Sequence, residues 1–356
     1  MEFHLVTSVG INTTNESDQS FQWTYPPYVE QSPGKFAVFI FFAVTFSVLG
    51  VFGNLLAIIS VAREKVLRVP ENMFIVSLAA ADILVAGCVL PFSIAGVVQG
   101  EVFFHHRVRL CEFLGTVCFI ACDCAFWCIT GLAVNRIVLV CYPKQYKRIF
   151  TWRTAPIFAF IPWCIASLTL LPMFLSWGGM EFDPESMICL FDFDKVPSSM
   201  FVAAVLCVSV SLSFVSIIVA HLRIKAKRRQ LAAIAPNISL MNVTVGDIKT
   251  KDKKGDITKE LRQEIDDIAL TGRLLTAIFI ASLIWLPFIV ALVSHHIMNY
   301  GRDFWAFANL LGHMQSGLDC LCYVIISKYF RRGYKNAIRL IFCCKKRQMY
   351  AAVENV

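Results

Sequence analysis

Residues 36–62 read FAVFIFFAVTFSVLGVFGNLLAIISVA, a stretch without any charged side chain. A helix needs roughly 20 predominantly apolar residues to cross the hydrocarbon core of a bilayer. A helix on the surface of a soluble protein keeps one polar face, whereas a helix that is apolar all round lies in a membrane or a large core. The stretch therefore predicts a transmembrane helix.

Six more stretches of this kind follow along the chain, and together they predict an all-α membrane protein. The composition agrees, since 57% of the 356 residues are hydrophobic and only 16% are charged. Two soluble domains of the same total length would carry more charge. We expect a seven-transmembrane helix bundle over residues 36–327, with the further spans at 72–98, 109–141, 154–176, 198–222, 268–297 and 303–327.

Lysine and arginine mark one side of this bundle. They gather at 63–68, 144–153, 223–262 and 331–347, after the first, third, fifth and seventh spans. Cytoplasmic loops carry such a basic excess, so we expect an extracellular N-terminus and a cytoplasmic C-terminus in the plasma membrane. The net charge of +8 is explained by attraction to anionic membrane lipid and implies no nucleic acid.

The segments outside the spans also predict structure and modification. Residues 1–35 form an extracellular tail in which Asn12 and Asn15 each begin a glycosylation sequon. A polar, Lys- and Asp-rich segment at about 224–266 predicts a mobile cytoplasmic loop. Apolar side chains recur at helical spacing after residue 328, so 328–356 is expected to contain a short amphipathic eighth helix and a tail. Two juxtamembrane cysteines there are candidate palmitoylation sites, Cys343 and Cys344.

The fourteen cysteines fall mainly within the predicted spans, where a thiol packs as a small apolar group. Cys111 and Cys189 are the two that reach the oxidising side, so we expect them to form one disulfide. The cysteines of the third span carry no convergent histidine or acid in the sequence, so we expect no metal there. Phosphate-binding loops, nucleophile elbows and zinc-protease motifs do not occur in the sequence, which predicts a protein that is not an enzyme.

Polar motifs at fixed places within the spans resemble those of the rhodopsin-like (class A) G-protein-coupled receptors. The resemblance covers nearly the whole bundle, because one motif falls in almost every span. It is carried by Gly53-Asn54, Leu78 to Asp82, Cys111, Asn135-Arg136-Ile137, Trp163, Trp285-Leu286-Pro287 and Asp319-Cys320-Leu321-Cys322-Tyr323.

Two further stretches are similar to melatonin receptors and related invertebrate orphan receptors. They are Ile129 to Arg136, and Phe182-Asp183-Pro184 leading into Cys189. The chain departs from the common class pattern at several positions that bear on activation. These are Ile137 for an aromatic residue, Ser213 and Cys320 for prolines, and Ala281 and Ile284 before Trp285.

The resemblance implies a receptor that binds an extracellular ligand and activates a heterotrimeric G protein, with inhibitory G proteins favoured. Arrestin is the other partner it implies. One alternative is a non-canonical seven-helix receptor that signals through arrestin or guides cell migration. A transporter is the second alternative, and it predicts helices broken near the middle of the membrane.

Ionisable residues within a bilayer are costly and usually mark function. By resemblance, Asp82 forms a cluster with Asn54, Ser316 and Asp319. This cluster would hold a structural sodium ion or share a proton between its two carboxylates. A hydrogen-bonded network without an ion is the alternative. No other cofactor is expected.

The resemblance also assigns the residues of G-protein coupling and activation. Arg136 follows Asn135 where the class has an acid, so we predict that Asp267, near the inner end of the sixth span, is its ionic partner. The alternative is that Asp267 belongs to a solvated acidic run with Glu264 and Asp266. Pro287 removes a helical hydrogen bond and supplies a pivot beside Trp285. Tyr323 closes the motif of the seventh span.

Candidate ligand-pocket residues lie toward the outer halves of the third, sixth and seventh spans. Cys118 stands where receptors for biogenic amines carry an aspartate, and Asp123, five residues deeper, is the candidate counter-ion. The alternative is that Asp123 faces the fourth or fifth span. The remaining candidates are Phe119, Phe288, Ile289, Asn309 and His313.

Overall fold

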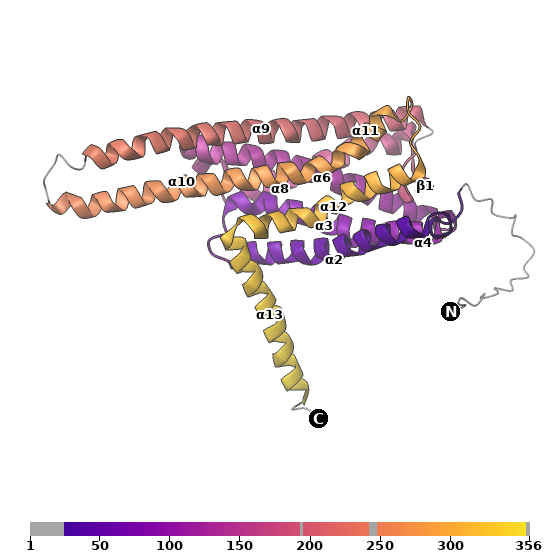
Figure 1. Ribbon diagram of the computed structural model, residues 1–356, viewed down its shortest axis with the longest axis horizontal. Helices are drawn as coiled ribbons and strands as arrows, with labels where there is room; N and C mark the ends of the chain where they lie inside the picture. The colour runs from indigo at the N-terminus through magenta and orange to yellow at the C-terminus, as the bar shows by residue number, and fades with distance from the viewer. Residues whose placement is uncertain (1–24, 193–194, 242–247, 354–356) are drawn as a thin grey trace, which may run out of the picture.

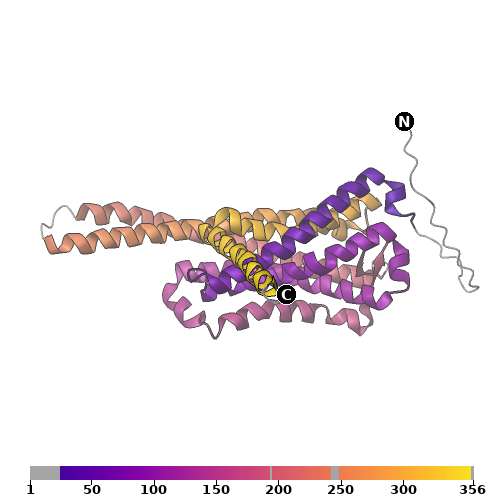
Figure 2. The ribbon, with the colours of Figure 1, turned by 90° about the horizontal axis from the view of Figure 1, so that it is seen from below.

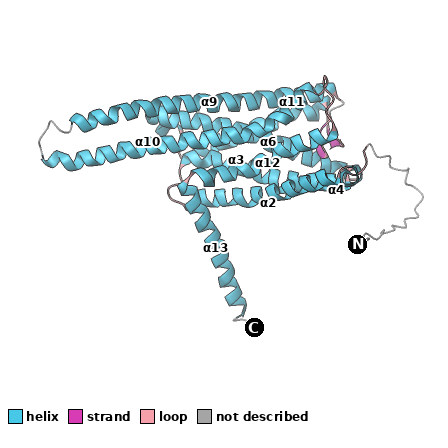
Figure 3. Ribbon diagram, in the orientation of Figure 1, coloured by secondary structure: helices cyan, strands magenta, loops and turns pink. Residues whose placement is uncertain are grey.

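The computed structural model is a bundle of long helices with one small β-hairpin at its end (Figure 1, Figure 3). It describes the backbone of residues 25–192, 195–241 and 248–353. Side chains are described over the same ranges except 176–177, 196, 234–262, 264, 267 and 341–353. The predicted modification sites Asn12 and Asn15, and the side chains of Cys343 and Cys344, lie outside these ranges.

The first two spans are long apolar helices joined by a tight turn. The second is interrupted by a π-turn that ends two residues before Pro91, whose missing amide hydrogen removes a helical hydrogen bond there. The elements are α1 (Tyr28–Gln31), α2 (Pro33–Arg63), η1 (Pro70–Asn72), α3 (Met73–Leu84), η2 (Val85–Val89), α4 (Leu90–Gln99) and α5 (Glu101–His105).

The third span, α6 (Val108–Cys141), is the central helix of the bundle and packs against α3, α8 and α9. After α7 (Pro143–Ile149), the fourth span is formed by α8 (Ala155–Thr169) and the π-turn η3 (Met173–Trp177). Strands β1 (Met180–Asp183) and β2 (Ile188–Phe191) then form an antiparallel hairpin with Phe182 opposite Cys189.

The predicted disulfide is confirmed and fixes this hairpin to α6. Cys189 of β2 is bonded to Cys111 near the start of the helix. Arg136 lies near the other end of α6, about 37 Å away at 1.5 Å per residue. We call the end of the bundle that carries β1 and β2 the hairpin end, and the opposite end the Arg136 end.

The fifth and sixth spans extend well beyond the bundle at the Arg136 end, where they lie side by side (Figure 1, Figure 2). They are α9 (Val196–Met241) and α10 (Ile248–Ser282), followed by η4 (Leu283–Trp285) and α11 (Leu286–Ser294). The segment 224–266, which the sequence predicts as a mobile loop, is helical apart from the undescribed 242–247. Its Lys, Arg, Gln, Leu and Ala residues favour helix, so the two spans continue instead of ending at the membrane surface.

The seventh span is α12 (Arg302–Ile326), and α13 (Lys328–Val353) leaves the bundle from its end as the predicted eighth helix (Figure 1). Within the part of the chain that the structure describes, six helical segments are long and apolar enough to cross a membrane by length and composition alone. The seventh, α12, is more polar, but its polar side chains Asn309, His313, Gln315 and Asp319 are buried against the other helices. The fold is therefore a seven-transmembrane helix bundle.

Candidate functional site

A small apolar cavity lies beneath the hairpin, between α6, α9, α11 and α12. Its volume is about 30 Å³, which is room for about two water molecules. The hairpin covers it with Met180, Leu190 and Phe191. The remaining lining comes from the helices: Gly115, Cys118, Phe119, Cys122, Leu206, Trp285, Phe288, Asn309 and His313.

The structure brings together most of the residues that the sequence assigns to a ligand pocket. Cys118, Phe119, Phe288, Asn309 and His313 all line this hairpin-end cavity. Ile289 is buried in the same apolar cluster but does not line the cavity. The predicted pocket residues do not include the hairpin side chains that cover the cavity, because nothing in the sequence of β1 or β2 shows which helices the strands will cover.

The predicted role of Asp123 as a ligand counter-ion does not fit its position. Asp123 is fully buried and accepts hydrogen bonds from Trp127 Nε1 (3.2 Å) and Thr169 Oγ1 (3.3 Å). Thr169 is on α8, so the carboxylate faces the fourth span, the alternative that the sequence left open. Each residue of an α-helix is rotated by about 100° from the one before, so Asp123, five residues after Cys118, lies about 140° around the helix from it.

Trp285 forms the floor of the hairpin-end cavity. Its ring packs edge-on against Phe126, Phe288 and His313, with ring centroids 5.6, 5.8 and 5.7 Å away. Gly312 of α12 faces the indole so closely that a Cβ there would lie 2.9 Å from Trp285 Cε3. The α-helix is interrupted just here, because η4 separates α10 from α11 and Pro287 follows. This break lies beside Trp285, where the sequence places the pivot supplied by Pro287.

A second small cavity lies on the other side of Trp285, deeper in the bundle. It has a volume of about 20 Å³ and is lined by Asp82, Ala125, Gln315 and Ser316, among others. Cys122, Trp285 and His313 line both cavities and therefore form the partition between them.

Asp82 contributes the one carboxylate among the described residues that line this deeper cavity. Asp82 is buried, and its Oδ2 has no hydrogen-bond partner among the described residues. One water molecule or one small cation fits the volume. The Asn54 amide instead donates to the carbonyls of Gly50 (2.9 Å) and Ser316 (2.8 Å), and Asp319 accepts from Gln315 (3.4 Å). Of the predicted cluster, Asp82 and Ser316 line the cavity, whereas Asn54 and Asp319 do not line it and instead contact its lining residues Ser316 and Gln315.

Arg136 is held in a polar network at the opposite end. Its Nη1 lies 3.5 Å from Glu71 Oε1, and its Nη2 donates to Asn72 Oδ1 at 3.1 Å. Tyr146 of α7 donates to Glu71 Oε2 (3.2 Å) and accepts from Asn135 Nδ2 (3.4 Å). Burial raises the pKa of Tyr146 to about 12, so the phenol remains a donor at neutral pH.

Glu71 is the residue that sequence reasoning missed in this network. It lies in η1, just before the second span, and the prediction instead named Asp267 as the acid. Asp267 belongs to α10, but its side chain lies outside the described residues, so the ion pair with Arg136 stays a prediction. Glu71 directly follows Pro70, where the chain re-enters the membrane next to the third span. This position of an acid is the feature of the sequence that indicates its pairing with Arg136.

A larger cavity of about 640 Å³ adjoins Arg136 and Glu71 at this end. Residues from α6, α10 and the start of α13 line it, including Val140, Thr271 and Phe330. Tyr323 is buried nearby, with its ring stacked on Phe330 at 5.2 Å between centroids. Among the described residues that line this cavity, Arg136 and Glu71 are the charged ones.

Two departures from the class pattern have visible consequences. Ser213, which replaces a proline, donates to the Phe126 carbonyl (2.7 Å) and ties α9 to α6. Cys320 keeps its amide hydrogen where the class has proline, and α12 runs without a break from Arg302 to Ile326.

The transporter alternative predicts helices that are broken near the middle of the membrane. The described breaks lie at η2, η3 and η4, each within two residues of a proline.

The hairpin end is also closed by a cluster around Arg302 that the sequence did not reveal. Arg302 is buried and donates to the carbonyls of Pro26 (2.8 Å) and Pro184 (3.1 Å) and to Gln31 Oε1 (2.7 Å). Its guanidinium also lies over the rings of Tyr25 and Tyr28, 5.1 and 5.3 Å from their centroids. One side chain thereby joins the N-terminal segment to the hairpin turn.

Comparison with known proteins identifies relatives over the whole bundle. Residues 53–323 match the family described as 7 transmembrane receptor (rhodopsin family). Melatonin receptor type 1A-A of Danio rerio is 24% identical over 355 residues, covering 98% of this chain and 91% of the relative. Melatonin receptor type 1B of Homo sapiens is 27% identical over 321 residues, covering 88% and 80%. Melatonin receptor type 1A of Mus musculus is 30% identical over 178 residues, covering 50% and 49%.

Proposed function

Because the chain belongs to the rhodopsin family of seven-transmembrane receptors, which bind an extracellular ligand and couple to G proteins, we propose that its ligand acts on the partition at Trp285. A ligand that enters beneath the hairpin contacts Trp285, and the indole lies beside the helix break at Pro287. Movement at this break displaces α10 at the Arg136 end. The position of Trp285 between a cavity and a helix break is the observation that carries this mechanism.

We place the hairpin end outside the cell and the Arg136 end in the cytoplasm of a plasma-membrane receptor. The Cys111–Cys189 disulfide supports this orientation, because disulfides persist on the oxidising side of a membrane. The basic residues at the Arg136 end support it as well. An antibody to an epitope at the N-terminus should label intact cells, and labelling that requires permeabilisation would reverse the orientation.

The ligand that we propose is a small, mainly apolar molecule without a strong positive charge. No carboxylate lines the hairpin-end cavity among the described residues, and its polar groups are Asn309 and His313 with two thiols. A cavity of about 30 Å³ is far below the roughly 300–1,000 Å³ of typical ligand sites, so a ligand must displace Met180 or other lining side chains. The relatives are melatonin receptors, and an indole amide of that kind meets this description.

On the cytoplasmic side we propose that the 640 Å³ cavity accepts a segment of an inhibitory G protein, and that arrestin competes for the same recess. Both proposals rest on Arg136, which can bind a partner only after it leaves Glu71 and Asn72. The two states of the bundle then differ in the group that Arg136 contacts. Lipid contacts α13, where Cys343 and Cys344 remain candidate palmitoylation sites.

We further propose that a sodium ion occupies the deeper cavity, held by Asp82 and Ser316. A cation there would neutralise a buried carboxylate whose Oδ2 lacks a partner among the described residues. A sodium ion between Trp285 and the Arg136 end would favour the resting arrangement of the helices.

The test of the receptor mechanism is basal activation of a panel of G-protein and arrestin sensors in transfected cells. The variants are wild type, Arg136→Ala and Glu71→Gln, each at matched surface expression. A basal signal from inhibitory G proteins that rises in Glu71→Gln and disappears in Arg136→Ala supports the proposal. A response of the arrestin sensor alone would favour the receptor that signals without a G protein.

A further inference from the structure

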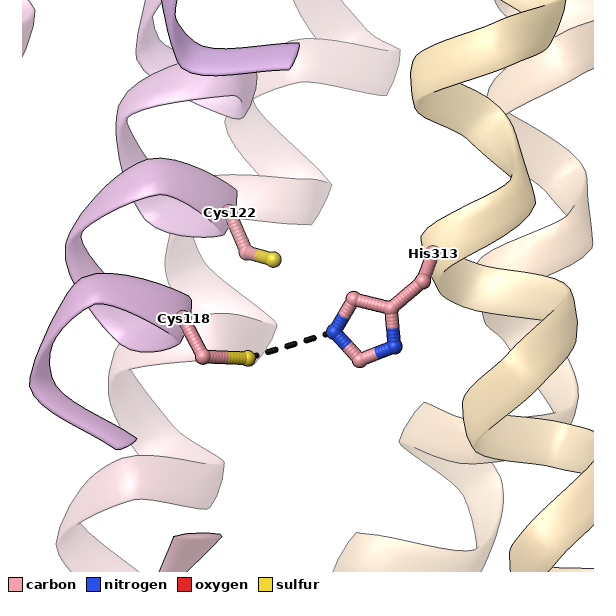
Figure 4. A group of neighbouring side chains, drawn as sticks. All are labelled: Cys118, Cys122 and His313. Atoms are coloured by element: carbon pink, nitrogen blue, oxygen red, sulfur yellow. Dashed lines mark hydrogen bonds between the residues drawn. The ribbon is translucent and has the colours of Figure 1, made fainter. Parts of the chain in front are cut away.

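Two thiols and one imidazole meet in the wall between the two small cavities. Cys118 and Cys122 are one helical turn apart on α6 and point toward His313 of α12 (Figure 4). The two Sγ atoms and a ring nitrogen all lie within 4.8 Å of one another, and Cys118 Sγ is 3.2 Å from His313 Nε2. All three side chains are buried. The sequence led us to expect no metal at these cysteines, because His313 is 195 positions from Cys118 and only the packing of α12 against α6 brings its ring nitrogen to the thiols.

We propose that Cys118, Cys122 and His313 form a binding site for Zn²⁺ within the ligand cavity. Tetrahedral zinc with Zn–S bonds of about 2.3 Å places its sulfur ligands about 3.8 Å apart. The three ligand atoms need to shift by less than about 1 Å each to reach that arrangement. Cysteine thiolates and histidine are the ligands that zinc prefers.

The orientation of the imidazole supports coordination through Nε2. His313 Nδ1 lies 2.9 Å from the carbonyl oxygen of Asn309, one turn earlier on α12. A carbonyl only accepts, so Nδ1 carries the proton and Nε2 presents its lone pair toward the thiols. A hydrogen bond from the non-ligating nitrogen to a carbonyl is the usual way in which metal-binding histidines are held.

Charge balance also suits the site. Each thiol releases its proton to solvent when its sulfur binds the metal, so one Zn²⁺ with two thiolates and a neutral imidazole has no net charge. A neutral complex avoids the large cost of an isolated ion in a membrane-spanning bundle. Three protein ligands leave a fourth position free, as in zinc sites that bind a further molecule. That position faces the cavity shared with Asn309, whose Oδ1 has no partner among the described residues.

The signalling consequence of this site rests on the proposed function, but metal binding does not. Zinc would link α6 to α12 across the partition that contains Trp285, and would therefore restrain the movement that a ligand induces. A ligand with a nitrogen, oxygen or sulfur donor would complete the coordination.

The first experiment is Co²⁺ binding to the full-length receptor purified in detergent without reducing agent. Cobalt that replaces zinc at thiolate ligands gives sulfur-to-metal charge-transfer absorption, which surface histidines cannot produce. We expect this absorption in wild type and in the control Cys124→Ala, a buried thiol of the same helix outside the cluster. We expect its loss in Cys122→Ala and His313→Gln, and its displacement by added Zn²⁺.

The second experiment uses only wild type, so it does not depend on how the variants fold. Cys118 and Cys122 should be protected from alkylation by added Zn²⁺ in peptide mass spectrometry, whereas Cys88 and Cys207 should alkylate equally with and without the metal. Unchanged alkylation of Cys118 and Cys122, or cobalt absorption that survives in His313→Gln, would overturn the zinc site. Either result would leave the G-protein measurements unaffected, so the two proposals fail separately.

Discussion

Arg136 and Glu71 are held 3.5 Å apart by residues from three separate elements, α6, η1 and α7. Both side chains are largely buried, at 8% and 24% exposure, so the pair is less screened by solvent than a surface ion pair. Removal of one partner leaves the other charge without compensation. The pair therefore stabilises the arrangement in which Arg136 contacts Glu71, and in the proposed mechanism this arrangement withholds Arg136 from a G protein.

Glu71→Gln should raise basal G-protein signalling. Loss of about 1–2 kcal/mol from the resting state changes a two-state equilibrium by roughly 5- to 30-fold. The measurement is sensor activation per receptor at the cell surface. Glu112→Gln, which removes the exposed pair with Arg109 at the hairpin end, is the matched control and should not change the signal. Equal basal signals from the two variants would show that Glu71 does not restrain Arg136.

Asp82→Asn should abolish the dependence of receptor stability on sodium. The neutral amide cannot compensate the charge of a cation in the 20 Å³ cavity. We expect the wild-type melting temperature in detergent to be higher in sodium chloride than in choline chloride, and the variant to melt at one temperature in both. Asp123→Asn is the control, since that buried carboxylate lies away from the cavity and should retain the sodium effect. A wild type indifferent to the cation would exclude the sodium site.

Gly96→Ala should displace the hairpin and lower both stability and surface expression. A Cβ at this position would lie 2.3 Å from the backbone oxygen of Met187, which the disulfide-linked hairpin cannot easily move. Overpacking of this kind typically costs about 1–3 kcal/mol. Thermal unfolding followed by tryptophan fluorescence measures the effect. Gly34→Ala meets no atom within 4 Å and should leave the melting temperature unchanged or slightly higher.

Arg302→Gln should release the segment Tyr25–Gln31 from the hairpin end. The variant loses the bonds to Pro26, Pro184 and Gln31, together with the contacts to two tyrosine rings. Hydrogen exchange should accelerate by at least several-fold at the amides of α1. Arg109→Gln, whose side chain is 93% exposed, should not affect these amides. Protection that persists in Arg302→Gln would mean that the tyrosines alone hold the segment.

Much of the architecture is determined by the sequence alone. Each apolar stretch is long enough to cross a bilayer by itself, and α-helices satisfy their own backbone hydrogen bonds there, so the spans follow from local composition. The Cys111–Cys189 disulfide follows from topology, because these two cysteines lie at one end of the bundle. The places of Asp82, Arg136 and Trp285 along the spans follow from motifs that lie within single helices.

Tertiary structure decided which side chains from different helices meet, because a rotation of one helix by a fraction of a turn changes the neighbour that a residue faces. Asp123 faces Thr169 instead of the cavity, and Arg136 contacts Glu71 of a turn that carries no motif. The same packing brings His313 to Cys118 and Cys122. Composition predicted lipid-exposed helices well because burial in lipid depends on each helix alone, whereas these three contacts depend on the angles and positions at which pairs of helices pack.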